Sequence, residues 1–165
     1  MEKEMISRNL NSDCNIQLFK LLNEKSKQII DEATEALVRA PVKHYNSNTA
    51  KQNRERLTNL LSLTSKSIKS KNLIPMVEYA QKISNERYED NFDLQEIQSA
   101  FNILEEVIWQ KISTDMKPQD YPEAFGLAST VLGAGKEAMA VEYVSLVSNR
   151  KNIKSLNLSE LFQGV

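Results

Sequence analysis

The sequence is poor in the residues from which most metal and redox sites are built. Its 165 residues include one cysteine, Cys14, and one histidine, His44. A single cysteine cannot form an internal disulfide bond, and one cysteine with one histidine cannot complete a structural zinc site. We therefore expect a reduced, cytoplasmic protein that holds no metal and no cofactor.

Glycine and proline are also scarce, with four of each in the chain. Folds built from strands and tight turns depend on glycine at positions where φ is positive. No Asn-Gly or Asp-Gly pair separates alternating apolar runs, so the sequence has no hairpin signal. These absences favour a helical protein over a β-protein.

Long apolar runs and an excess of one charge are missing as well. Residues 1–10 mix charges with apolar residues, so we expect no signal peptide, and no run is long enough to predict a membrane span. The 21 basic and 22 acidic residues nearly balance, which gives no general attraction to nucleic acid. With 41% hydrophobic residues, the composition predicts one globular domain over 1–165, in which residues 1–12 are flexible.

Apolar residues recur at spacings of three and four along most of the chain, which is typical of amphipathic helices. The pattern predicts an all-α fold, a globin-like bundle of about five main helices with a short C-terminal helix that docks on it. The predicted helices cover 15–40, 50–70, Pro75 to the polar stretch 89–91, Asp93 to a break at 117–121, and 122–149, followed by the tail 155–165.

Local signals mark several helix ends. Ser12 or Asp13 can cap the first helix, and Pro41 stops it because proline cannot continue the hydrogen-bond ladder. The apolar stripe thins between Asn23 and Lys27, which leaves open a break there. Asp93 followed by Glu96 predicts a capping box at the start of the fourth helix.

The last long helix carries many small residues on its apolar stripe. Such a stripe favours close helix packing, either within the chain or at a dimer seam. Gly133 and Gly135 weaken the middle of this helix, so we consider a kink there. Lys136 follows these glycines, but the spacing and the helical setting do not match a phosphate-binding loop.

No arrangement of reactive residues predicts catalysis. His44 lies in a polar connection, and the nearest carboxylate in the sequence is Glu55. Cys14 has no nearby base to activate it. We therefore expect no enzyme activity and assign no catalytic, cofactor-binding or metal-binding residue.

Two stretches carry opposite charges. Residues 51–71 hold six basic residues against one acidic, whereas residues 78–96 hold six acidic against two basic. No aromatic residues are interleaved with the basic ones, so we do not expect nucleic-acid binding. The basic face is either solvated or meets an acidic surface such as 78–96 across a dimer.

The most characteristic stretch is 72–104. It leads from Met76–Ala80 into a block with the pattern R-x-x-x-x-F-x-L-x-E-I-x-x-A, which is formed by Arg87, Phe92, Leu94, Glu96, Ile97 and Ala100. This pattern resembles the N-terminal helical sensor (input) domain of RsbR-type stressosome co-antagonist proteins and related bacterial sensors. The resemblance covers about residues 15–115.

The resemblance implies a non-catalytic, globin-like domain that dimerises, receives a signal and passes it to a protein partner in a stress response. The phosphorylated threonines of that family belong to a downstream domain, so no phosphorylation site carries over. The family pattern transfers no binding residue beyond the block that starts at Arg87, and that block also suits a purely structural role.

We therefore expect a bacterial signalling domain that acts through homodimerisation and through binding of a partner or ligand. The alternative is a carrier that holds a small apolar ligand in a cavity between its helices. The candidate interaction or pocket residues are Arg87, Phe92, Glu96, Phe101, Leu104, Trp109, Phe125 and Tyr143.

Overall fold

The computed structural model describes residues 14–40 and 50–150, and these form helices without any strand. The all-α class is therefore confirmed for the described ranges. Outside these ranges lie the segment 1–12, for which we predict flexibility, the predicted caps Ser12 and Asp13, the connection that contains His44, and the tail 155–165. The elements are α2 (Cys14–Glu24), α3 (Ser26–Arg39), α5 (Ala50–Ser70), α6 (Ile74–Glu89), α7 (Leu94–Asp115), the short 3-10 helix η1 (Pro118–Asp120) and α8 (Tyr121–Arg150).

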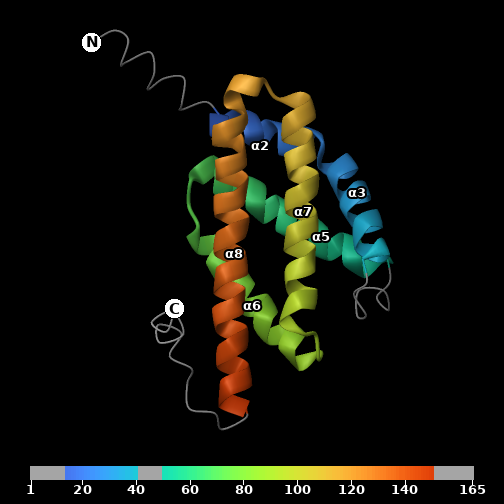
Figure 1. Cartoon of the computed structure of the whole chain (residues 1–165), viewed down its shortest axis with the longest axis vertical. Coiled ribbons are helices and arrows are strands. Elements are labelled where there is room, and N and C mark those ends of the chain that lie inside the picture. The colour runs from blue at the N-terminus through green and yellow to red at the C-terminus, as the bar shows by residue number, and fades with distance from the viewer. Residues whose placement is uncertain (1–13, 41–49, 151–165) are drawn as a thin grey trace, which may run out of the picture.

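The long helices α7 and α8 lie side by side at the front of the molecule, joined at the top by η1 (Figure 1). Helix α6 packs along α8, and α5 crosses behind, where it contacts α2 and α3. All six described α-helices contribute buried apolar side chains to one core. None of the helices in the described ranges combines the length and apolarity that crossing a bilayer requires.

The predicted first helix is two helices, α2 and α3, separated by Lys25. The Lys25 backbone has φ −96° and ψ 8°, yet its N–H still donates to the Leu21 carbonyl at 2.9 Å. The break therefore lies within the region where the apolar stripe thins. The bend lets α3 pack against both α5 and α7.

Two other helices follow the sequence signals closely. Helix α5 has the predicted bounds and buries the predicted face, including Leu57, Leu61 and Ile68. The capping box of α7 is confirmed, because the Glu96 N–H donates to Asp93 Oδ1 at 2.8 Å and the Asp93 N–H donates to Glu96 Oε2 at 3.1 Å.

Helix α8 continues without interruption through Gly133 and Gly135 and runs straight there (Figure 1). A Cβ at Gly135 would lie 2.7 Å from Phe101 Cε1 and 3.0 Å from Met76 Sδ. Gly135 is therefore the point where α8 closely approaches side chains of α6 and α7. A Cβ at Gly133, in contrast, would meet nothing within 4 Å.

Candidate functional site

Several of the predicted interaction residues meet at the turn from α6 into α7. The Phe92 ring is 5% exposed, and two guanidinium groups lie over it. The Cζ atom of Arg87 is 5.5 Å from the ring centroid, and that of Arg56, from α5, is 5.6 Å away. This geometry is a double cation–π contact, which is stronger where the groups are withdrawn from water.

Hydrogen bonds fix this corner from three sides. The Phe92 N–H donates to the Arg87 carbonyl at 2.9 Å, and the Tyr143 hydroxyl of α8 donates to the Phe92 carbonyl at 3.0 Å. The Arg87 Nη1 atom is 3.7 Å from Asp90 Oδ2. The carboxylate of Glu96, 7% exposed, accepts the capping bond described above. The corner is thus a tightly held junction of α5, α6, α7 and α8.

The space beside this corner is small. A hollow lined by Arg56, Tyr79, Arg87 and Phe101 has a volume of about 20 Å³, which is room for one water molecule. Burial raises the pKa of the Tyr79 phenol, and Arg87 and Arg56 oppose that shift. This hollow cannot hold an organic ligand without rearrangement, so the arrangement favours a structural role for the block that starts at Arg87.

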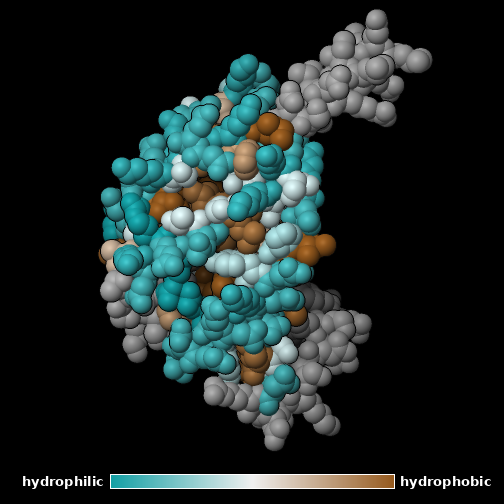
Figure 2. All heavy atoms as spheres, turned by 180° about the vertical axis from the view of Figure 1, so that it is seen from behind, coloured by the Kyte–Doolittle hydropathy of each residue, from teal (hydrophilic) through white to brown (hydrophobic). Residues whose placement is uncertain are grey.

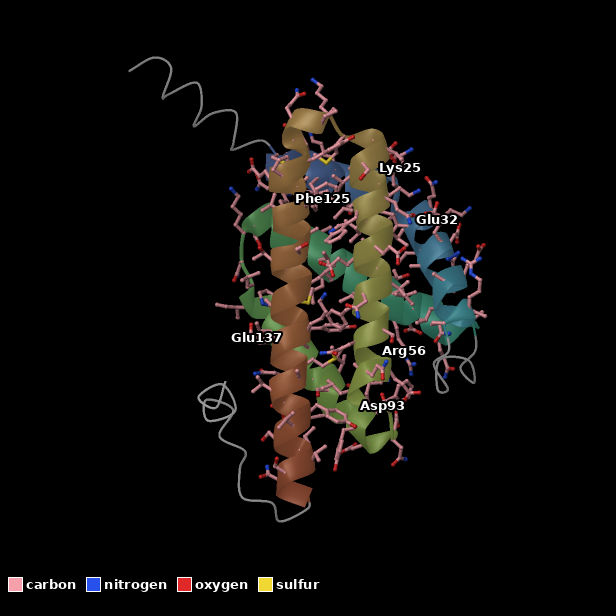
Figure 3. The ribbon with its side chains drawn as sticks, viewed as in Figure 1. Lys25, Glu32, Arg56, Asp93, Phe125 and Glu137 are labelled. Atoms are coloured by element: carbon pink, nitrogen blue, oxygen red, sulfur yellow. The ribbon has the colours of Figure 1, made fainter. Side chains whose placement is uncertain are left out.

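A second group of predicted residues lies on the surface between α7 and α8. The indole of Trp109, 43% exposed, meets the edge of the Phe125 ring with a centroid distance of 5.7 Å. The Tyr121 ring is 5.8 Å from the Phe125 ring, and the Tyr121 hydroxyl donates to the Ser113 carbonyl at 2.6 Å. Figure 3 shows Phe125 near the top of α8, whereas Arg56 and Asp93 lie near the lower end of α7. The structure therefore places six of the eight predicted residues in two separate groups.

Leu104 belongs to neither group. It has no exposed surface and lies in the core, as Phe101 does at 1% exposure. Both side chains pack against their neighbours, and neither lines one of the three larger hollows described next.

Among the described residues, three larger hollows have no predicted interaction residue in their linings. One of about 380 Å³ lies between α2, α3 and α5, one of about 410 Å³ between the end of α5 and α8, and one of about 370 Å³ between the ends of α6 and α8. On the face opposite to that of Figure 1, apolar atoms are visible in hollows between hydrophilic side chains (Figure 2). Such spaces depend on how helices meet, so the periodicity of one helix could not reveal them.

The surroundings of Cys14 disfavour a reactive thiolate. Cys14 is 2% exposed, and its Sγ donates to the Asp120 carbonyl at 3.9 Å. Burial, helped by Glu123 and Asp120, raises the pKa of the thiol to about 11, which disfavours the reactive thiolate. Among the described residues, no group of three or more His, Cys, Asp or Glu side chains could hold a metal ion.

Part of the basic face of α5 is paired within the chain. Arg54 forms an ion pair with Asp31 of α3, and the Lys69 ammonium lies 4.6 Å from the centroid of the Phe19 ring. The residues Lys51, Arg54, Lys66 and Lys69 of this face are all exposed in the single chain, which leaves both predicted alternatives open.

No protein-family model and no curated protein matches the chain. The all-helical class follows from the structure alone. The resemblance to RsbR-type input domains stays a prediction, and its functional content belongs to the proposal below.

Proposed function

We propose that this chain is a non-catalytic regulatory domain that forms a homodimer through α8 and passes a signal to a protein partner in the cytoplasm. In this proposal the helices have the globin-like arrangement of RsbR-type input domains, and the process served is a bacterial stress response. One structural observation carries the proposal, and it concerns the side chains that α8 presents to solvent.

Helix α8 has an outward face with little charge. Between residues 133 and 148 the exposed positions are Glu137, Val141 and Ser145, and the half-buried Ala134 and Val144 lie on the same side. We call these five residues the α8 outer face. A surface helix normally presents a charged or polar face to water, but here one residue of the five is charged. Val141 is 53% exposed.

This outer face is shaped for another helix. Its side chains are small or β-branched apart from Glu137, so a second helix can approach closely along it. No described helix lies in front of α8 in Figure 1. The apolar surface at Val141 and Val144 would therefore leave water on contact with a second copy, which favours association.

The experiment compares two valines of nearly equal exposure. Val141 is 53% exposed on α8, and Val38 is 52% exposed on α3. The wild-type chain should show about twice its mass of 18.8 kDa by size-exclusion chromatography with light scattering. Val141→Glu buries a charge in the proposed interface and should give a monomer, whereas Val38→Glu should leave the dimer intact.

Circular dichroism should show that both variants keep the helix content of the wild type. A wild-type monomer at every concentration overturns the proposed function. A Val141→Glu variant that remains as dimeric as Val38→Glu also contradicts it, because the contact would then lie elsewhere.

A further inference from the structure

The groove between the end of α5 and the first half of α8 has the features of a ligand site. Its volume is about 410 Å³, and its apolar walls are formed by Ile68, Leu73, Leu127 and Val131. We call this space the α5–α8 groove. In Figure 1 the turn between α5 and α6 lies to the left of α8. The size of the groove falls within the range of small-molecule sites.

A buried hydroxyl without a partner lies against this groove. Ser67 is 2% exposed, and its Oγ forms no hydrogen bond with any described residue. Other hydroxyls of α5 donate to the carbonyl four residues earlier, as Thr64 does to Leu60 at 2.7 Å and Ser70 does to Lys66 at 3.0 Å. Because buried hydroxyls are almost always paired, the Ser67 hydroxyl is an unused donor at the wall of the groove.

Two side chains of opposite charge also line the groove. They are Lys71, after the end of α5, and Glu123, in the first turn of α8. Neither forms an ion pair within the part of the chain that the structure describes. Lys71 also has a φ of 51°, at a helix end where glycine is the usual residue. An occupant that satisfies both groups carries one charge of each sign.

Gly126 leaves the wall of the groove open. It lies within α8, where glycine weakens a helix, and a Cβ at this position would meet nothing within 4 Å. Packing within the chain therefore does not require glycine here, in contrast to Gly135. A side chain at this position would enter the open space beside α8.

We propose that the α5–α8 groove binds a zwitterion with an apolar body, namely a free apolar amino acid or a short apolar peptide. Its carboxylate pairs with Lys71 and accepts a hydrogen bond from Ser67, while its ammonium pairs with Glu123. The apolar part lies against Ile68, Leu73, Leu127 and Val131. A fatty acid fits less well, because Glu123 repels a carboxylate that has no ammonium beside it. This inference deepens the proposed function, since it supplies the regulatory domain with a signal.

Isothermal titration calorimetry on the full chain tests the site with three probes. They are leucine, leucyl-leucine, and acetyl-leucyl-leucine amide, which lacks both charges. We expect saturable binding of leucine or leucyl-leucine, at least ten times tighter than that of the capped probe. Tighter binding of leucine identifies a free amino acid as the ligand, and tighter binding of leucyl-leucine identifies a peptide.

Variants then place the ligand in the groove. Lys71→Gln and Glu123→Gln should each weaken binding at least tenfold, and Gly126→Leu should abolish it by filling the space. Gly133→Leu is the matched control, because a Cβ at Gly133 of α8 would also meet nothing within 4 Å, and Gly133 does not line the groove. Thermal unfolding should show that all four variants fold.

The proposal is overturned if neither charged probe binds, if the capped probe binds equally well, or if Gly126→Leu binds as the wild type does. Val141→Glu separates this test from that of the dimer. As a monomer, Val141→Glu should still bind whichever of leucine and leucyl-leucine binds the wild type, since the groove residues all belong to one chain. If the ligand test fails, the proposed dimer is therefore not contradicted. If the dimer test fails, the proposed ligand site is not contradicted.

Discussion

At the scale of single residues, glycines decide how closely the helices of this protein pack. Gly135 and Gly133 lie two positions apart in α8 but have opposite surroundings. A Cβ at Gly135 would lie 2.7 Å from Phe101, whereas one at Gly133 would have no neighbour within 4 Å. The same glycine-to-alanine change should therefore have opposite effects at the two positions.

We predict that Gly135→Ala lowers the free energy of unfolding by about 1–2 kcal/mol. The overpacking destabilises the fold by more than the higher helix propensity of alanine stabilises it. Gly133→Ala should raise it by up to about 1 kcal/mol. Urea unfolding followed by circular dichroism measures both. Equal stability of the two variants would contradict the close packing of α8 at Gly135.

A second residue-scale prediction concerns Cys14 and alkaline pH. The thiol pKa is about 11 in the folded chain against an ordinary value of 9.0, because burial disfavours the thiolate. The unfolded chain therefore releases this proton first, and stability should fall as the pH rises from 9 to 11. Cys14→Ala should show a smaller fall across that window in urea unfolding at each pH. Parallel curves for the two proteins would show that the thiol ionises equally in both states.

At the scale of helices, the sequence predicts where a helix begins and ends better than it predicts which helices pack together. The bounds of α5 and the capping box of α7 depend on residues close together in the chain, so local patterns suffice. The stacking of Arg56 on Phe92 joins a residue of α5 to one in the turn between α6 and α7, and it could not be predicted. The kink considered at Gly133 and Gly135 is absent from the continuous α8, because glycine there accommodates Phe101 and Met76.

The same distinction applies to the candidate sites. Arg87, Phe92 and Glu96 belong to one contiguous block of the sequence, and the structure brings them together at one corner. The α5–α8 groove combines Ser67 and Lys71 with Glu123, which are more than 50 positions apart in the sequence. No periodicity within one helix relates such residues, so only the folded chain shows the groove.

The capping box of α7 gives a prediction at this scale. Asp93→Ala should lower the free energy of unfolding by about 1 kcal/mol, since it removes the acceptor for the Glu96 N–H. Asp93→Ser keeps an oxygen in place and should recover most of that loss. Thermal denaturation of the three proteins measures the effect, and an alanine variant as stable as the serine variant would contradict it.

At the scale of the whole molecule, the proposed homodimer depends on what covers α8. The core is shared by the six described α-helices, so the fold gives α8 a buried side against α6 and α7. Its other side presents Val141 and Val144 with one charge, Glu137, between residues 134 and 145. The proposed homodimer through this face would explain why the outer face of a 30-residue helix carries so little charge.

The most direct test of this claim is sedimentation equilibrium of the wild-type chain over a range of concentrations. We predict a mass that rises to about twice 18.8 kDa and stays there, and the mass of one chain for Val141→Glu over the same range. A wild-type mass of one chain at every concentration would contradict the account, because the outer face of α8 would then be exposed to water in the functional state.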